Sequence, residues 1–502
     1  MTTPHRAPRE THGNGRNVRN VRELLADRNE ARRRFKPYPA YKDSGVEWLG
    51  EIPAGWDVAP VYARYEVALG KMLDAKRVTG ECSGRYLRNV DVQWDRVNTE
   101  GLPEMDFAPW ERDRYSVRPG DLFVCEGGEV GRTAIWRGEI EQCFYQKALH
   151  RVRPRAEREV PRFFYYLMHM VASRGVFAGA GNQNTIDHLT ATQLRHYRFP
   201  FAPGYEQRAI AAFLDRETAR IDALVAKKER LIELLQEQRT ALITRAVTKG
   251  LPAEAAAKAG LDTNVPMKDS GVEWLGEIPA HWEVKRVRHL MSRIEQGWSP
   301  DCENREADEA EWGVMKAGCV NRGVFVESEH KALPAALQPI TELEIHEGDL
   351  LMSRASGSRE LVGSVALVPK CRPRLLLCDK VFRLHLNPKE GHRSFLAYSM
   401  NSRIARWQIE VVLSGGSGLA NNIAQGVVKD LIVPIPPRAE QRAIAAFLDR
   451  ETAEIDSLTA KVRDAIDRLK ELRTALISAA VTGKIDVRGA TAEAWAPQGG
   501  LA

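Results

Sequence analysis

The stretch Glu206–Ala219 reads EQRAIAAFLDRETA, and the same letters return at Glu440–Ala453. A second identical pair, KDSGVEWLGEIPA, stands at Lys42–Ala54 and at Lys268–Ala280, each time shortly before a tryptophan. The first pair is offset by 234 residues and the second by 226, so the second unit is eight residues longer in its middle. The chain is therefore an internal repeat, in which two identical frames enclose different contents.

The two enclosed middles, residues 59–199 and 285–433, share few letters but keep common landmarks. The triplet Gly-Asp-Leu at 120–122 matches the same triplet at 348–350. Short alternating runs bounded by Gly and Pro predict strands in both middles. A proline-rich segment closes each middle before the repeated helix begins. We expect an α+β fold, with two mixed α/β domains of one architecture in tandem.

The repeated stretch after each middle predicts a long helix. Apolar residues recur there in steps of three and four without Gly or Pro, as in a coiled-coil seam of about three heptads. Two helices of about 40 residues, each about 60 Å long, would pair through this seam; the alternative is a core helix in each domain. The predicted seam consists of Ile221, Leu224, Leu231, Leu235, Leu242, Ile455, Leu458, Val462, Leu469, Leu472 and Leu476, with Lys228 and Gln238 as polar exceptions.

The repeat divides the chain into seven predicted segments. They are a basic, disordered tail at 1–40, a first domain at 41–205, a central helix at 206–250, a linker at 251–266, a second domain at 267–439, a distal helix at 440–483 and a C-terminal tail at 484–502. The alternative for the arginine-rich first segment is an arm that binds phosphates without sequence preference.

Composition excludes several classes of protein. The 502 residues are 43% hydrophobic and 28% charged, as in ordinary globular proteins. A formal charge of +6 is too small to identify a nucleic-acid binder by itself. No apolar run is long enough to span a membrane, and the seven scattered cysteines suggest reduced thiols. We therefore expect a cytoplasmic protein that does not associate with membranes.

Catalytic and metal-binding motifs are missing from the sequence. It contains no P-loop, no Asn-Pro-Pro-aromatic tetrapeptide of adenine methylation, no nucleophile elbow and no Cys/His spacing suited to zinc. The carboxylates of Glu126 and Glu129 are at most a weak hint of a nuclease. We predict no catalytic residue and no metal ligand in this chain, which we interpret as a binding protein.

Guanidinium, ammonium and amide side chains gather in short stretches of both middles. Arginine can bind guanine through two hydrogen bonds, and asparagine or glutamine can bind adenine in the same way, so these stretches suit the DNA major groove. A solvated loop is the alternative for each residue taken singly. The candidates are Arg85, Arg88, Asn89, Gln93, Gln146, Lys147, Asn182, Gln183 and Asn184 in the first middle, and Lys316, Asn321, Arg322, Arg354, Ser356, Arg359, Asn421 and Asn422 in the second.

The doubled KDSGVEWLGEIPA openings, the proline-rich closures running into EQRAIAAFLDRETA and the long helices resemble the specificity subunit of type I restriction–modification systems. The resemblance covers about residues 41–484. It implies that each middle is a target recognition domain reading one half of a split DNA sequence. It also implies that the helices form an antiparallel coiled coil with pseudo-two-fold symmetry.

The resemblance further implies the partners of the chain. They would be double-stranded DNA, two methyltransferase subunits and restriction subunits. S-adenosylmethionine, ATP and magnesium would be used by these partners, so that the present chain needs no cofactor of its own. Two alternatives are a coiled-coil scaffold whose middles bind protein, and an autonomous tandem DNA-binding regulator.

Overall fold

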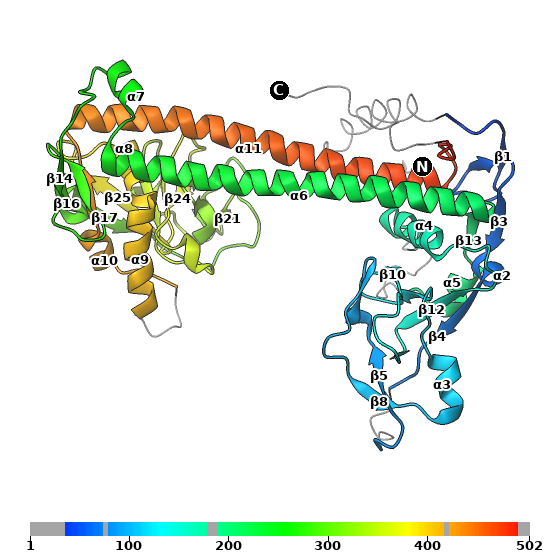
Figure 1. The fold of residues 1–502 in the computed structure, drawn as a ribbon. Coiled ribbons are helices and arrows are strands. Elements are labelled where there is room, and N and C mark those ends of the chain that lie inside the picture. The colour runs from blue at the N-terminus through cyan, green and yellow to red at the C-terminus, as the bar shows by residue number, and fades with distance from the viewer. Residues whose placement is uncertain (1–35, 74–78, 178–187, 416–420, 490–502) are drawn as a thin grey trace, which may run out of the picture. The chain divides into compact units, whose positions relative to one another are not determined.

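The computed structural model describes residues 36–73, 79–177, 188–415 and 421–489 (Figure 1). These residues form two compact units: unit 1 comprises residues up to 227 and from 465 onward, and unit 2 comprises residues 228–464. In the described part of the chain, no helix is both long enough and apolar enough to cross a membrane.

Two long helices each contribute one half to each unit. They are α6 (Gly204–Lys249) and α11 (Arg438–Val481), and they lie side by side within each unit (Figure 1). Proline precedes both helices, at Pro203 and Pro437, and a glycine with positive φ follows closely after both, at Gly250 and Gly483. Glycine adopts this left-handed conformation without strain, which makes it the usual residue just past a helix end.

Unit 1 contains the first mixed α/β domain. Its strands are β1 (Tyr41–Asp43), β2 (Glu51–Pro53), β3 (Asp57–Pro60), β4 (Tyr65–Leu69), β5 (Ser83–Leu87), β6 (Val92–Gln93), β7 (Arg96–Val97), β8 (Glu104–Asp106), β9 (Leu122–Cys125), β10 (Thr133–Ile135), β11 (Phe144–Tyr145), β12 (Leu149–Pro154) and β13 (Arg198–Phe201). Its own helices are α2 (Val61–Arg64), α3 (Pro109–Tyr115), α4 (Pro161–Ser173) and α5 (Ala191–His196).

Unit 2 contains the second mixed α/β domain. Its strands are β14 (Met267–Asp269), β15 (Glu277–Pro279), β16 (Glu283–Arg286), β17 (Met291–Gln296), β18 (Gly313–Met315), β19 (Val320–Asn321), β20 (Val324–Phe325), β21 (His330–Ala332), β22 (Leu350–Ser353), β23 (Val365–Leu367), β24 (Leu375–Leu376), β25 (Val381–Leu386) and β26 (Ile432–Ile435). Its own helices are α7 (Ala253–Lys258), which lies in the predicted linker, α8 (Arg393–Asn401), α9 (Arg403–Gly415) and α10 (Gln425–Asp430).

The two domains have the same sheet topology. A four-stranded sheet has the order β10-β9-β12-β4 in unit 1 and β23-β22-β25-β17 in unit 2. A three-stranded sheet has the order β11-β5-β8 in unit 1 and β24-β18-β21 in unit 2. In both of these the first pair of strands is parallel and the second is antiparallel. The predicted α+β class with two tandem domains is thus confirmed.

The identical openings build identical hairpins. β1 pairs with β2 and β14 with β15 in the same antiparallel register. The tryptophan after each hairpin, Trp56 or Trp282, is buried in the core of its unit, as core anchors of a repeated frame should be. Trp56 packs edge-on against Phe163 of α4, with ring centroids 6.3 Å apart.

The glutamine of each EQRAIAAFLDRETA stretch ties the long helix to its domain. Gln207 accepts a hydrogen bond from the Val160 amide and donates to the Ala202 carbonyl, both at 2.9 Å. Gln441 accepts from the His392 amide at 2.8 Å and donates to the Pro436 carbonyl at 2.9 Å. The two glutamines, which stand at the same position of the repeat, therefore make the same pair of contacts in both units.

The two long helices pair as an antiparallel coiled coil. Some of the predicted seam residues lie in the observed seam and others lie outside it. Between residues 221 and 242 of α6, every residue outside the observed seam is exposed. The observed seam consists of Ile221, Val225, Lys228, Ile232, Leu235, Arg239 and Leu242 on α6, and of Ile455, Thr459, Val462, Ile466, Leu469, Arg473 and Leu476 on α11.

Four predicted seam residues lie outside the observed seam. Leu224, Leu231 and Leu458 are 39%, 40% and 45% exposed, and Leu472 is half-buried against the unit 1 core. The true seam passes one residue beyond each of them. The polar side chains of Thr459, Arg239 and Arg473 concealed the true period, because an apolar pattern counts such positions as solvent-facing.

The predicted tail boundaries at residues 40 and 484 also differ from the structure. Tyr38 is buried in the unit 1 core, packs against Trp56, and its hydroxyl donates to the Glu206 carboxylate. Ile485 and Val487 are buried in the same core, and the Asp486 amide donates to the Lys36 carbonyl at 2.9 Å. The segments 36–40 and 484–488 therefore belong to the folded unit, whereas 1–35 and 490–502 lie outside the described residues.

Candidate nucleic-acid interface

The same backbone position in each domain carries a polar side chain out of the sheet. β9 and β22 are fully buried, and the next residues, Glu126 and Arg354, are half-exposed. The amide of Glu126 donates to the Ala148 carbonyl at 3.0 Å, and that of Arg354 donates to the Lys380 carbonyl at 2.8 Å. The ends of β9 and β22 are therefore equivalent positions of the two domains.

The chain that returns past each strand end makes a further matched bond. The Leu189 amide donates to the Glu126 carbonyl at 2.7 Å, and the Ile423 amide donates to the Arg354 carbonyl at 3.0 Å. Immediately before these residues stand His188 in unit 1 and Asn422 in unit 2. Each strand end is thus bounded by two other segments of its own domain.

In unit 2 the structure brings several predicted residues together. The Ser356 amide donates to the Asn421 carbonyl at 3.2 Å, and the Asn421 side chain donates to the Gly357 carbonyl at 3.3 Å. Ala355 and Asn422 form an antiparallel bridge. Arg354, Ser356, Asn421 and Asn422 therefore lie together on one polar surface.

The guanidinium of Arg354 is held in place within this surface. Its Nη1 donates to the Asp379 carbonyl at 3.1 Å, and it lies 5.9 Å from the Phe382 ring centroid. Burial alone would raise the pKa of Asp379, but a hydrogen bond from Ser299 and the charges of Lys380 and Arg354 hold that pKa below its usual value. The Asp379 carboxylate therefore remains ionised beside Arg354.

The remaining candidates of unit 2 lie on neighbouring loops. Arg322, in the turn between β19 and β20, pairs with Glu360 at 3.3 Å, with both side chains exposed. Arg359 donates to the Glu410 carbonyl and to the Ser414 hydroxyl. Lys316 is 3.8 Å from Glu329, and Asn321 is exposed. Lys316 and Arg322 thus face carboxylates of their own domain, and Arg359 is engaged with α9.

Two predicted residues of unit 1 serve its own structure. Arg88 binds Asp91 through two hydrogen bonds at 2.9 and 2.8 Å, and this carboxylate raises the pKa of Arg88. The Asn89 side chain donates to the Gly127 carbonyl at 2.8 Å and accepts from Arg132 at 3.0 Å. The amide of Asn89 is therefore used inside the domain, which weakens the prediction that it reads a base.

Other predicted residues of unit 1 face solvent. Arg85, Gln93 and Lys147 are exposed and Gln146 is half-exposed; the Gln93 side chain donates to the Val90 carbonyl at 3.0 Å. The predicted residues Asn182, Gln183 and Asn184 lie outside the described residues.

Several candidate residues occupy equivalent positions in the two domains. Arg88 precedes the short 3₁₀ turn of unit 1 as Lys316 precedes that of unit 2, and Gln93 ends β6 as Asn321 ends β19. Sequence reasoning missed Glu126 as the counterpart of Arg354. The signal was available, because the Gly-Asp-Leu triplets are offset by 228 residues and the same offset separates these two residues.

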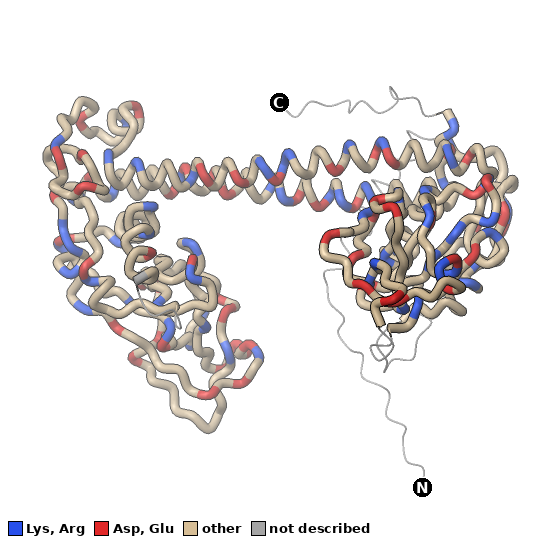
Figure 2. Tube along the Cα trace, turned by 60° about the horizontal axis from the view of Figure 1, so that its bottom comes forward, with Lys and Arg blue, Asp and Glu red and all other residues tan. Residues whose placement is uncertain are grey.

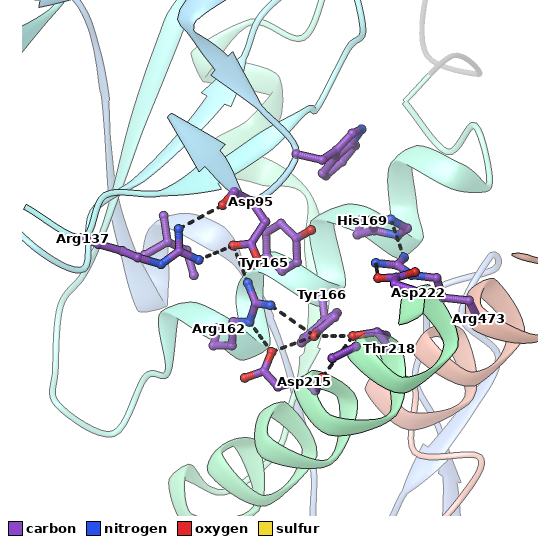
Figure 3. Close-up of a pocket in the computed structure, with 13 residues that line it drawn as sticks. Asp95, Arg137, Arg162, Tyr165, Tyr166, His169, Asp215, Thr218, Asp222 and Arg473 are labelled. Carbon is purple, nitrogen blue, oxygen red and sulfur yellow. Dashed lines mark hydrogen bonds and ion pairs between the residues drawn. The ribbon is translucent and has the colours of Figure 1, made fainter. Parts of the chain in front are cut away.

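A cleft of unit 1 lies where the first mixed α/β domain meets the long helices. Its volume is about 680 Å³, and it is lined in part by Trp94, Tyr165, His169 and Arg473 (Figure 3). Arg473 of α11 donates to His169 at 3.3 Å and pairs with Asp222 of α6 at 3.0 Å. Burial and the neighbouring Arg473 lower the pKa of His169 to about 4, so its ring is neutral at pH 7.

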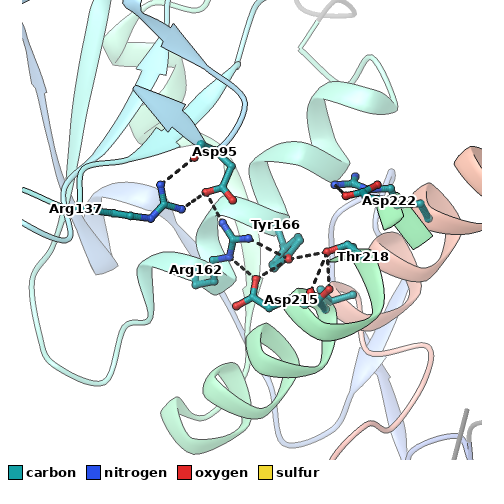
Figure 4. A network of polar contacts seen from close by, with 9 residues as sticks. Asp95, Arg137, Arg162, Tyr166, Asp215, Thr218 and Asp222 are labelled. Atoms are coloured by element: carbon teal, nitrogen blue, oxygen red, sulfur yellow. Dashed lines mark hydrogen bonds and ion pairs between the residues drawn. The ribbon is translucent and has the colours of Figure 1, made fainter. Parts of the chain in front are cut away.

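A chain of ion pairs crosses this cleft from the first mixed α/β domain to α6 (Figure 4). Asp95, in the turn between β6 and β7, pairs with Arg137 at 2.6 Å and with Arg162 at 2.5 Å. Arg162 also pairs with Asp215 of α6 at 2.5 Å, and Tyr166 donates to the same carboxylate at 2.7 Å. Burial disfavours the charged form of Arg162, yet these carboxylates raise its pKa. The chain anchors the hairpin of the first domain to the helix.

Unit 2 has a reduced version of this anchor. Tyr398 donates to Asp449 of α11 at 2.8 Å, matching Tyr166 and Asp215. The turn position of Asp95 is occupied by Gly323, so the arginine bridge has no counterpart there. The two domains thus differ in how their hairpins are held.

The described residues of both units carry charges of both signs. Lysine and arginine are interleaved with aspartate and glutamate along both long helices (Figure 2). Within the described ranges, no group of three or more His, Cys, Asp or Glu side chains is placed to hold a metal ion. The exposed arginines, lysines and amides at the strand ends are the groups with the chemistry to contact phosphates and base edges.

Comparison with known proteins gives a consistent result. The model of the type I restriction modification DNA specificity domain matches residues 110–234 and 282–468. The EcoEI specificity subunit of Escherichia coli, a type I restriction enzyme component, is 30% identical over 206 residues, which are 41% of this chain and 34% of that protein.

A second relative aligns over nearly the whole chain. The putative type I restriction enzyme MjaX specificity subunit of Methanocaldococcus jannaschii is 23% identical over 451 residues, covering 88% of this chain and 96% of its own length. A solved chain, from work on complex assembly and conformational transition of the type I R-M system, covers 86% of this chain and 99% of its own. Its TM-score is 0.58 at 17% identity, which supports the fold.

Proposed function

Because the chain belongs to the type I restriction–modification DNA specificity family, we propose that its two recognition domains read the two halves of a split DNA target. As a specificity subunit it is a DNA-recognition component without catalytic activity of its own. The observation that carries the proposal is the pair of domains with one topology and one frame but different side chains at equivalent exposed positions, such as Glu126 and Arg354.

The proposal assigns a spacing role to the long helices. Arginine, lysine, asparagine and glutamine side chains at the strand ends would contact base edges and phosphates, while the coiled coil would fix the gap between the half-sites. Support comes from the frame contacts of Gln207 and Gln441, which attach each domain to its helix in the same way.

We also propose that the repeated frame binds two methyltransferase subunits, and that restriction subunits join them. Identical surfaces presented twice suit two copies of one partner. Leu224 and Leu458 occupy the same position in the repeat and are both exposed, 39% and 45%, so the frame offers matched apolar contacts. S-adenosylmethionine, ATP and magnesium would lie on the partners, and the complex would act in the cytoplasm, where host DNA is found.

Selection of duplex DNA tests the reading of a split target. The full chain, bound to a random-sequence duplex library, should enrich two short half-sites separated by a gap of fixed length. Replacing residues 59–199 with the middle of a relative should change one half-site and leave the other intact. Enrichment of a single continuous site, or a change in both halves, would contradict the proposal.

Affinity capture tests the partner assignment. The tagged chain, co-expressed with a methyltransferase subunit from the same genome, should retain about two copies of that subunit per chain. A chain that enriches a split site yet captures no methyltransferase would instead be an autonomous DNA-binding regulator. A chain that binds no specific DNA would favour the scaffold alternative.

A further inference from the structure

At the ends of β9 and β22, the two domains present polar residues of opposite charge from the same backbone setting. In unit 1 the Cys125 amide donates to the Arg132 carbonyl at 2.9 Å, and the Gly131 amide returns a bond to Cys125 at 3.1 Å. In unit 2 Ser353 makes the same two bonds with Ser364 and Gly363, at 2.8 and 2.7 Å. Glu126 and Arg354 follow directly.

The two bonds of the next residue complete the match. The amides of Glu126 and Arg354 donate to Ala148 and Lys380, and their carbonyls accept from Leu189 and Ile423. With four backbone hydrogen bonds shared, the two side chains leave the sheet from equivalent positions and in equivalent directions. A difference between them is therefore a difference in chemistry and not in placement.

The sign of the charge also differs between the two domains at a second pair of equivalent positions. The residue before Ala148 is Lys147, which is exposed, and the residue before Lys380 is Asp379. Unit 1 thus combines a carboxylate at the strand end with a nearby ammonium, and unit 2 combines a guanidinium with a nearby carboxylate. The two domains therefore present acidic and basic groups in exchanged positions.

The state of the two side chains suits contact with a ligand. Arg354 is held by the Asp379 carbonyl and the Phe382 ring, and among the described residues its Nε and Nη2 make no further hydrogen bond. Within the described part of the chain, the Glu126 carboxylate makes no hydrogen bond or ion pair. Both side chains are half-exposed, so a base edge can reach them.

We propose that Glu126 and Arg354 are the equivalent base-reading residues of the two domains, Glu126 accepting from the amino group of a cytosine and Arg354 donating to the O6 and N7 atoms of a guanine. Carboxylates accept hydrogen bonds from cytosine N4 in the major groove, and arginine binds guanine through two hydrogen bonds. This inference rests on the proposed reading of a split target, and names the residue in each half that selects one base.

The test is selection from a random-sequence duplex library with the full chain and two pairs of variants. Arg354→Glu should reduce the preference for one guanine about tenfold or more, in one half-site only. Glu126→Arg should abolish the preference for one cytosine, in the other half-site only. Positions outside these two should keep their wild-type preferences.

Conservative variants separate base reading from folding. Arg354→Lys keeps the charge but offers no planar pair of donors, so the guanine preference should weaken while the preferences at all other positions stay unchanged. Glu126→Gln should shift the selected base from cytosine toward adenine, because an amide both donates and accepts.

The outcomes distinguish this inference from the proposed function. If wild-type protein enriches a split site and the Arg354→Lys and Arg354→Glu variants retain the guanine unchanged, the assignment of Arg354 is wrong and the proposed function stands. If Glu126→Arg and Arg354→Glu alter the same half-site, the equivalence is wrong. If wild-type protein enriches no sequence at all, the proposed function itself fails, and the inference with it.

Discussion

Arg473 on α11 binds Asp222 on α6 through Nε and Oδ1, 3.0 Å apart. Arg239 on α6 binds Asp456 on α11 in the same way at 3.2 Å, so the pair recurs with the helices exchanged. From one pair to the other, α6 advances by seventeen residues while α11 recedes by seventeen. Both pairs therefore fit one antiparallel register of the coiled coil.

Charge reversal at these pairs should reveal their coupling. Asp222→Arg places two guanidinium groups together, and we expect it to lower the free energy of unfolding by about 1 kcal/mol, since the pair is partly exposed. Asp222→Arg combined with Arg473→Asp should recover most of the loss. Urea denaturation of the four proteins of the cycle measures this. If the double variant recovered none of the loss, pairing across the coil would be irrelevant to stability.

The corrected seam predicts a sharp contrast between two leucines four residues apart. Leu235 is 7% exposed and Leu231 is 40% exposed. Leu235→Asp buries an unpaired charge and should cost about 2–4 kcal/mol, whereas Leu231→Asp should cost less than about 1 kcal/mol. Thermal unfolding compares them directly. Equal losses would restore the seam that the leucine spacing alone predicts.

The neutral His169 should make unit 1 sensitive to acid. An unfolded histidine takes up a proton near pH 6.5, but the folded ring does so only near pH 4, because it is buried and faces Arg473. The unfolded state therefore binds more protons between these values, and stability falls as the pH drops from about 6.5 to about 4, by about 3 kcal/mol at most. The other charged groups around the ring are Glu129 and Asp222.

A substitution copied from unit 2 provides the control for this titration. Asn401 stands in α8 where His169 stands in α4, and His169→Asn should flatten the dependence of unfolding free energy on pH. The wild-type protein, with His169 intact, is the reference. Urea denaturation at pH 7.5 and pH 5 measures both. A variant with the wild-type pH dependence would assign the acid sensitivity to another group.

Lengthening both helices together tests whether they measure the gap between half-sites. Seven residues inserted after Arg230 and seven after Asp464 preserve the heptad and both arginine–aspartate pairs. The helices gain about 10 Å, which equals about three base-pair steps. Selection from random duplex DNA should return the same half-sites with a gap about three base pairs longer. If the variant still bound DNA but selected half-sites separated by the wild-type gap, the helices would not set the distance between the half-sites.

The repeat made the fold predictable, whereas side-chain roles depended on distant contacts. Identical frames and shared Gly-Asp-Leu triplets predicted two domains of one topology. By contrast, Tyr38 contacts Glu206 across 168 residues, and no local pattern marks it as part of the core. Asn89 resembled a base reader because its type suits adenine, but its partners Gly127 and Arg132 become visible only in the fold.

The seam shows how a correct pattern can give the wrong phase. The leucines at 224, 231 and 458 satisfy a heptad as well as the residues that are buried. Periodicity scores side chains as apolar or polar, and it therefore passed over Arg239 and Arg473, whose long stems are half-buried in the seam while their charged ends reach aspartates. Geometry was needed to choose between two phases one residue apart.

The arginines in the seam also disfavour a parallel pairing of the two helices. Arg239 and Arg473 occupy the same position of the repeat, as do Asp222 and Asp456. If the helices paired parallel and in register, arginine would meet arginine and aspartate would meet aspartate, at a cost that apolar seam residues alone would not impose. Two nearly identical helices, which hydrophobicity would allow to align either way, are thereby given a direction. The two arginines that interrupt the apolar pattern therefore favour the antiparallel orientation of the helices.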